Sequence, residues 1–228
     1  MKLVCLPCAG GTMHLYEDLV KYLNPAIEVL EVEYSGHGTR KNEKPYGTSE
    51  EMVQDILRKI DDFINGDEYA LLGYSMGCCA VLGVLKEKKD SLPTHVFMAA
   101  HCPTNKKCAL DDESLKSRII KLDGIPDEWR DNGLFWRMYL PIYRNDYRIL
   151  NDFDYSLYRM KYRVPCTVFF SNKDISQQQI RCWEEFFEDS PKYINFSGGH
   201  FFIRSHAEEM AVIISNCFIK NQEDINGI

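Results

Sequence analysis

The sequence predicts an α/β fold, in which a mostly parallel central sheet is flanked by helices. Short apolar runs alternate along the chain with amphipathic stretches, which is the pattern of a parallel sheet covered by helices. Several of these runs lack polar alternation, as expected for strands that are buried on both faces. The 228 residues suit one α/β domain, so we assign residues 1–228 to a single domain.

Six segments are candidate strands because they are short, apolar and bounded by turn residues. They cover residues 2–6, 27–34, 69–73, 95–100, 166–170 and 193–196.

Two helices carry clear end signals. Residues 50–64 place apolar side chains every three or four positions, and Thr48 with Glu51 predicts a capping box at their start. Asn65-Gly66 predicts the end of this helix. The last helix is expected to open with a second capping box, Ser205 with Glu208, and to run to about residue 220. Residues 221–228 would then form a frayed tail.

One region interrupts the alternation of strands and helices. Residues 104–163 contain no convincing strand, only helical patterns that Asp123-Gly124, Asn132-Gly133 and Pro141 separate. Because this stretch lies between two predicted strands, we interpret it as a helical insertion over one end of the sheet. In an enzyme this position suits a lid, although a helical layer that only packs against the sheet is the plainer alternative.

Composition excludes several classes of function. The formal net charge of -7 argues against a nucleic-acid-binding protein that depends on phosphate contacts. No stretch approaches the roughly 20 apolar residues that span a bilayer, and Pro7 with Gly10-Gly11 interrupts any early signal segment. We therefore expect a cytoplasmic protein that binds neither nucleic acid nor membrane. The absence of an apolar heptad or repeat favours a monomer.

The nine cysteines are scattered and odd in number, which fits reduced thiols. Cys5 and Cys8 have CxxC spacing, but Cys5 falls inside a predicted buried strand and no second pair completes a zinc site. We interpret these thiols as small packing groups, and we expect neither a metal nor a cofactor.

The most specific motif is Gly73-Tyr74-Ser75-Met76-Gly77, which follows an apolar strand and precedes a helical run. This is the context of a nucleophile elbow, a sharp strand-to-helix turn that exposes the serine hydroxyl above the sheet. The two glycines remove side chains that would clash at the bend. The motif predicts an α/β-hydrolase fold with Ser75 as nucleophile.

An elbow serine needs a general base, and in this fold the histidine follows the acid near the C-terminus. His200 ends the loop Phe196-Ser197-Gly198-Gly199 directly after the last predicted strand, so it is the predicted base. His206 is the rival, but it falls in the first turn of the final helix, where solvent exposure is expected. His37 is interpreted as a turn residue, with a structural role favoured over the alternative that it lines the pocket. His101, at the end of a predicted strand near the lid, is a candidate to support the site from behind the triad.

The acid should follow the preceding strand, so that its carboxylate reaches the imidazole Nδ1. Asp174 lies in the turn after residues 166–170 and is the predicted acid; Asp152 and Asp154 are alternatives. The oxyanion hole needs two backbone N–H donors. One is expected from Met76 and the other from Ala9, with Cys8 as the alternative.

Several motifs together resemble the type II thioesterases, the stand-alone enzymes that accompany nonribosomal peptide and polyketide synthases. In chain order they are Pro7-Cys8-Ala9-Gly10-Gly11, Ser35-Gly36-His37-Gly38-Thr39-Arg40, the elbow, Leu140-Pro141-Ile142-Tyr143-Arg144-Asn145-Asp146-Tyr147 and Gly198-Gly199-His200-Phe201-Phe202. The chain departs from the family at Ser35, where proline is usual, and at Cys8, where an aromatic or polar residue is usual.

The resemblance implies a substrate: an acyl or aminoacyl thioester on the phosphopantetheine arm of a carrier protein. Hydrolysis would clear stalled or misprimed carriers. Residues 105–163 hold 12 Lys/Arg against 10 Asp/Glu, whereas the remainder holds 15 against 24. We therefore hypothesise that the insertion carries the face on which the carrier docks.

Three other functions stay open at this point. The same triad would serve a small-molecule carboxylesterase or an acyltransferase. A hydrolase-fold binding protein without catalysis is the alternative from another class, and the complete serine, acid and histidine set argues against it.

Overall fold

All six strands of the protein form one sheet, in the order β2-β1-β3-β4-β5-β6, with every neighbouring pair parallel. The computed structural model describes residues 1–226, with the backbone alone from residue 219 on. All six predicted strands are present, with ends within one residue of the prediction except in the second, which was predicted over residues 27–34 and covers only Glu28–Glu31. Their bounds are β1 (Lys2–Leu6), β2 (Glu28–Glu31), β3 (Tyr69–Tyr74), β4 (His95–Ala99), β5 (Cys166–Phe170) and β6 (Lys192–Asn195).

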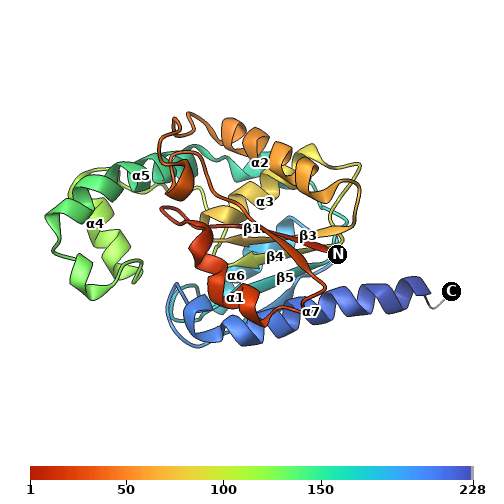
Figure 1. Cartoon of the computed structure of the whole chain (residues 1–228). Coiled ribbons are helices and arrows are strands. Elements are labelled where there is room, and N and C mark those ends of the chain that lie inside the picture. The colour runs from red at the N-terminus through yellow and green to blue at the C-terminus, as the bar shows by residue number, and fades with distance from the viewer. Residues whose placement is uncertain (227–228) are drawn as a thin grey trace.

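Helices cover both faces of this sheet. Figure 1 shows α2 (Ser49–Ile64) and α3 (Met76–Glu87) on one face and α1 (Glu17–Tyr22) and α7 (Ile203–Asn226) on the other. The four inner strands are almost wholly buried, whereas β2 and β6 at the edges are partly exposed. This burial explains why the inner strands show no polar alternation.

The strand order creates a switch point between β1 and β3. The chain leaves β1 toward β2 on one side of the sheet, and leaves β3 toward β4 on the other. In parallel sheets, ligands bind in the crevice that this reversal opens at the carboxyl ends of the strands. The segments after Leu6 and Tyr74 therefore meet at the edge where a site is expected.

The start of α2 matches the predicted capping box only in part. The Thr48 side chain accepts the Glu51 N–H, but the Glu51 carboxylate accepts from Gly47 N–H at 2.6 Å and not from Thr48. The predicted end is confirmed, because Asn65 adopts a left-handed conformation with φ 45° and Gly66 follows with φ 85°.

The predicted start and end of the last helix are wrong. Helix α7 begins at Ile203, and a kink at His206, where φ is -126°, replaces the expected cap. The Ser205 hydroxyl donates to the Phe202 carbonyl at 3.2 Å, so it does not cap the chain at Glu208. The helix continues to Asn226; residues 227 and 228 of the predicted tail lie outside the described part of the chain.

The chain between β4 and β5 is helical, as predicted. It contains α4 (Asp112–Lys121), η3 (Asp127–Trp129), α5 (Gly133–Asp152) and η4 (Tyr155–Tyr158). The expectation that Pro141 separates two helices is wrong, because Pro141 lies inside α5. Buried side chains precede and follow it on one face of α5, and packing them against α4 outweighs the hydrogen bond that proline removes. They are Trp136, Leu140, Tyr143 and Tyr147.

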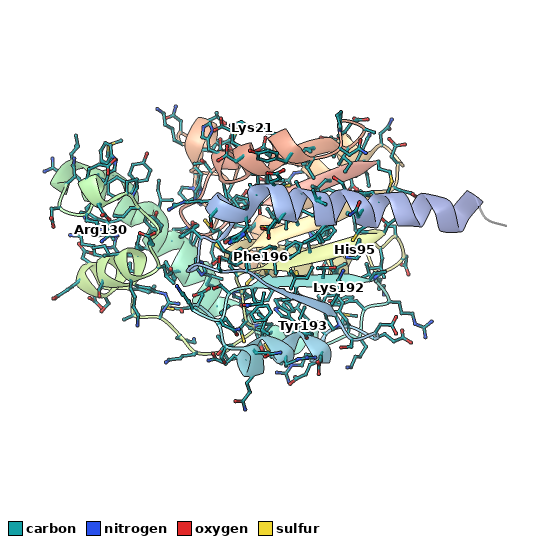
Figure 2. All side chains as sticks on the ribbon, turned by 90° about the horizontal axis from the view of Figure 1, so that it is seen from below. Lys21, His95, Arg130, Lys192, Tyr193 and Phe196 are labelled. Atoms are coloured by element: carbon teal, nitrogen blue, oxygen red, sulfur yellow. The ribbon has the colours of Figure 1, made fainter. Side chains whose placement is uncertain are left out.

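These insertion helices project to one side of the sheet. Figure 1 shows α4 and α5 beyond the edge where β1 and β3 end. Figure 2 places Arg130 in this projecting part, while Phe196 lies beneath α7 near the middle of the molecule. The remaining short helices are η1 (Met13–Tyr16), η2 (Gly38–Arg40), α6 (Gln177–Ile180) and η5 (Arg181–Glu185). Within residues 1–226, no helix has both the length and the apolar character needed to cross a membrane.

Candidate active site

Ser75 lies at a strained turn between β3 and α3. Its backbone has φ 52° and ψ -111°, a conformation that residues other than glycine rarely adopt. The Ser75 N–H donates to the Ala99 carbonyl at 2.8 Å, which ties the turn to β4. The strand-to-helix turn predicted from the pentapeptide is therefore present.

Two glycines allow this turn to pack closely. A Cβ on Gly73 would lie 2.6 Å from the backbone of Gly77. A Cβ on Gly77 would lie 2.0 Å from the carbonyl oxygen of Leu6, at the end of β1. The first turn of α3 thus rests against backbone that side chains cannot displace.

His200 lies on the loop after β6 and faces Asp174. Its Nδ1 is 2.7 Å from the Asp174 Oδ2, and the ring is almost buried. Tyr74, next to Ser75, donates its hydroxyl to the His200 carbonyl at 2.6 Å. Ser171 donates to the Gly198 carbonyl and so fixes the start of the same loop. These bonds hold the backbone of the His200 loop from β3 and from the turn after β5.

Asp174 lies in the turn after β5, as predicted. Its N–H donates to the Ser171 carbonyl at 3.0 Å, which closes the turn and directs the carboxylate to His200. The two alternative acids, Asp152 and Asp154, line a separate hollow, and Asp154 accepts hydrogen bonds from Ser156.

His206, the rival base, is turned elsewhere. Its Nε2 lies 2.9 Å from the Ser197 hydroxyl, and its side chain is only 17% exposed. The expectation that solvent surrounds it is wrong, because the kink in α7 packs the ring against Phe196.

Ser75, Asp174 and His200 line one cavity of about 240 Å³. Ser75 and His200 also line a second, smaller cavity whose other walls are mainly apolar. Among the hydrogen bonds of the described residues, none joins the Ser75 hydroxyl to the His200 ring. The first cavity is completed mainly by residues after β4 and from the insertion, among them His101, Cys102, Lys106, Arg118, Asn151 and Tyr155. The second is lined by Cys8, Ala9, Ile119, Leu122, Gly124, Tyr143, Tyr147 and Phe201.

Residues 7–11, which we call the β1 turn, form one wall of the second cavity. The Gly11 N–H donates to the Cys8 carbonyl at 3.0 Å, with Ala9 and Gly10 at the centre of the turn. Among the described residues, the N–H groups of Ala9 and Met76 have no hydrogen-bond acceptor. Two unpaired donors from the β1 turn and the start of α3 therefore lie on either side of the switch point.

His101 is a partly buried, neutral imidazole beside this site. Its Nε2 lies 2.7 Å from the Tyr155 hydroxyl, and it lines the first cavity with Ser75. Burial lowers the pKa of His101 to about 4, because desolvation disfavours the charged ring. At pH 7 His101 is therefore uncharged and lines the cavity as a hydrogen-bonding side chain.

This pKa predicts how stability depends on pH. In the unfolded chain His101 binds a proton below about pH 6.5, whereas the folded protein resists protonation down to about pH 4. The free energy of unfolding should therefore fall as the pH is lowered through this window, by up to about 1.4 kcal/mol per pH unit from this group. Urea unfolding of wild type and His101→Gln at several pH values measures the contribution. Parallel pH curves for the two proteins would contradict it.

The remaining candidate residues, His37, Cys5 and Cys8, are packed inside the fold. His37 is 3% exposed and lines neither cavity; it contacts Asp146 of α5, a residue of the family-like segment 140–147 for which no role was predicted. Cys5 and Cys8 are buried in the core, and burial raises the pKa of Cys8 to about 12. No set of three or more His, Cys, Asp or Glu side chains in the described chain is arranged to hold a metal ion.

Comparison with known proteins places the chain in a family. Residues 1–218 match the thioesterase domain family. A relative is the gramicidin S biosynthesis protein GrsT of Aneurinibacillus migulanus, which is 24% identical over 221 residues, 92% of this chain and 86% of the relative.

Solved structures agree in fold over almost the whole chain. ClbQ, from the colibactin NRPS/PKS pathway, superposes with a TM-score of 0.87 at 25% identity and covers 98% of both chains. The type II thioesterase BorB, from the borrelidin biosynthetic cluster, has a TM-score of 0.82 at 25% identity and covers 95% of this chain and 91% of its own. The resemblance inferred from the motifs is confirmed: the chain belongs to the thioesterase domain family and is similar to the type II thioesterases of peptide and polyketide pathways.

Proposed function

We propose that this protein is a serine thioesterase that hydrolyses acyl or aminoacyl thioesters on the phosphopantetheine arm of carrier proteins, and so clears stalled or misprimed carriers. One observation carries the proposal. In a chain of the thioesterase family, the elbow serine, the His200–Asp174 pair and two unpaired backbone N–H groups lie together beside two cavities that share Ser75 and His200. The pathways named for GrsT and ClbQ support carriers as partners.

In the first step the Ser75 Oγ attacks the thioester carbonyl carbon. His200 takes the hydroxyl proton on Nε2, while Asp174 accepts the hydrogen bond from Nδ1 and stabilises the imidazolium that forms. Contact between Ser75 and His200 is expected to tighten when substrate binds, as catalytic hydrogen bonds commonly do.

The carbonyl oxygen becomes negatively charged in this step. The N–H groups of Met76 and Ala9, or of Cys8 beside it, would donate to it, and the N-terminus of α3 adds positive potential. The C–S bond then breaks, the pantetheine sulfur leaves with the proton from His200, and Ser75 carries the acyl group. Water, deprotonated by His200, attacks this ester and releases the acid and the serine hydroxyl.

The two cavities suggest how the substrate lies. The apolar cavity, with Ile119, Leu122 and Tyr143, has a volume of about 20 Å³ and suits the methyl group of a short acyl chain. The larger cavity, which Lys106 and Arg118 border, suits the polar pantetheine arm. Since the insertion supplies walls to both, we assign to residues 104–163 the role of a lid. The hypothesis that this insertion also docks the carrier stays a prediction.

A comparison of substrates tests the function. We expect kcat/KM for an acetyl-loaded carrier protein to exceed that for a short oxygen ester by at least about tenfold, because only the carrier substrate fills both cavities. Release of acetate, followed by mass spectrometry of the carrier, measures the first rate, and ester turnover the second. Faster turnover of the oxygen ester would favour a carboxylesterase. Acyl release that requires an added alcohol or amine would favour an acyltransferase.

A further inference from the structure

Asp146 joins three parts of the protein that are distant in sequence. It lies in α5 and is 1% exposed. Its Oδ2 accepts the Gly10 N–H at 2.6 Å and lies 2.9 Å from the His37 Nε2. A buried carboxylate is costly unless it is paired and hydrogen-bonded, so this arrangement requires both partners.

His37 compensates the charge of this carboxylate. Its Nδ1 lies 3.1 Å from the Ser35 carbonyl oxygen, and its Nε2 faces Asp146. Both partners can only accept, so both ring nitrogens carry protons and the ring is an imidazolium. Burial opposes this charge, but the bonds to Asp146 and Ser35 outweigh it and raise the pKa of His37 above its ordinary value.

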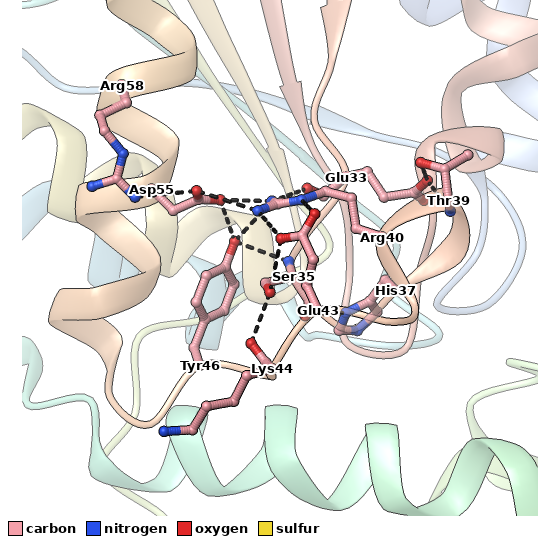
Figure 3. Close-up of polar contacts among 10 residues, drawn as sticks. All are labelled: Glu33, Ser35, His37, Thr39, Arg40, Glu43, Lys44, Tyr46, Asp55 and Arg58. Atoms are coloured by element: carbon pink, nitrogen blue, oxygen red, sulfur yellow. Dashed lines mark hydrogen bonds and ion pairs between the residues drawn. The ribbon is translucent and has the colours of Figure 1, made fainter.

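The loop that carries His37 is held by its own contacts. The Glu33 carboxylate accepts the N–H and the hydroxyl of Thr39, both at 2.8 Å. The Arg40 guanidinium binds Asp55 of α2 at 2.7 Å, together with Glu43. Figure 3 shows Arg40 between these carboxylates, with the His37 ring on the same loop. His37 is therefore a fixed anchor for Asp146.

The β1 turn is held by two residues of α5, Tyr143 and Asp146. Gly10 has φ +66°, and a Cβ on it would lie 2.1 Å from the Tyr143 ring, one helical turn before Asp146. Asp146 draws the Gly10 N–H toward α5. The N–H of Ala9, the preceding residue in the turn, is left without an acceptor in the described protein, and Ala9 lines a cavity with Ser75 and His200.

We propose that Asp146 is a positioning residue of the oxyanion hole: it fixes the β1 turn so that its free N–H groups face the carbonyl oxygen of the substrate, and His37 neutralises its charge. This inference rests on the proposed function. Neutralisation by His37 is needed because the negative field of Asp146 reaches the β1 turn. There it adds to burial in raising the pKa of Cys8. Without the imidazolium, the same field would oppose the developing oxyanion.

Asp146→Asn tests the proposal, since it removes the charge and leaves the size of the side chain almost unchanged. Using acetyl-loaded carrier protein, we expect kcat to fall about 10- to 100-fold, somewhat less than the loss of a whole oxyanion donor, with KM within about twofold. Rates are counted per serine titrated to completion with a fluorophosphonate, so unfolded protein does not contribute. Asp131→Asn, an exposed aspartate of the same insertion, is the matched control and should keep the wild-type kcat.

His37→Gln gives a second route to the same answer. It should also lower kcat, and adding it to Asp146→Asn should cause little further loss, because the two side chains act as one unit. A kcat per titrated site within twofold of wild type in Asp146→Asn, or a loss confined to KM, would overturn the inference.

A different result would show that the proposed function, and not the role of Asp146, is wrong. A wild-type protein that reacts with fluorophosphonate but releases no acid from the carrier would overturn the function alone. The inference would then be judged by the rate of fluorophosphonate labelling, because that reaction also builds negative charge on an oxygen in the same hole. A labelling rate in Asp146→Asn equal to that of wild type would overturn it.

Discussion

Ser75→Ala is expected to lower kcat for carrier thioester hydrolysis by at least about 10³-fold, because it removes the hydroxyl that the elbow presents to the thioester and that His200 would deprotonate. The turn that presents the hydroxyl is strained, with φ 52°, and such strain is maintained where a side chain must be held in one position. Single-turnover release of acetate from the carrier measures the loss.

Two accompanying results complete this experiment. The variant should not react with fluorophosphonate, and its unfolding midpoint should stay close to that of wild type. Ser117→Ala, which removes an exposed hydroxyl from α4, should retain full activity. A Ser75→Ala protein that kept a tenth of the wild-type rate would show that the thioester is attacked by another group, such as water that His200 activates directly.

Gly77→Ala is expected to destabilise the protein by about 3 kcal/mol or more, because the added methyl group would overlap backbone. Its Cβ would lie 2.0 Å from the Leu6 carbonyl oxygen and 3.1 Å from that of Pro7. Leu6 ends β1, which is paired with β2 and β3, and Pro7 opens the β1 turn, so relief requires α3 to move. That movement would displace Ser75, and an error of 1 Å in a reacting group costs about 10²-fold in rate.

Gly133→Ala provides the matched control for this substitution. Gly133 opens α5, and a Cβ there would meet nothing within 4 Å. Its stability should change by less than about 0.5 kcal/mol. Denaturant unfolding of both variants measures the difference, and equal stabilities would contradict the close approach of α3 to β1.

Most of the fold and the candidate triad could be predicted from the sequence, because their signals are local. The inner strands are continuous apolar runs, and the elbow is recognisable from five consecutive residues that begin with Gly73 and end with Gly77. The order serine, acid, histidine then selected Asp174 and His200, which the structure places 2.7 Å apart. Their catalytic roles stay predictions until the variants are measured.

What could not be predicted depends on contacts between distant segments. Pro141 is a local signal for a helix end, but the packing of α5 against α4 outweighs it. Ser205 has the sequence of a cap, yet its hydroxyl bonds backward to Phe202 because α7 kinks at His206. Asp146 lies in a segment that resembles the family, but its partners are distant in sequence; only the fold brings Gly10 and His37 to its carboxylate.

The position of the helical insertion has a consequence for how such a protein can evolve. Its two ends join β4 and β5, which are neighbours in the sheet, so the sheet closes the gap whatever the length of chain between them. Lengthening a loop whose ends are already held together costs little entropy. The elements that carry Ser75, Asp174 and His200 lie outside this stretch. Changes in this stretch can therefore reshape the cavity walls that it supplies without moving the candidate triad, provided that Asp146 keeps its bond to Gly10.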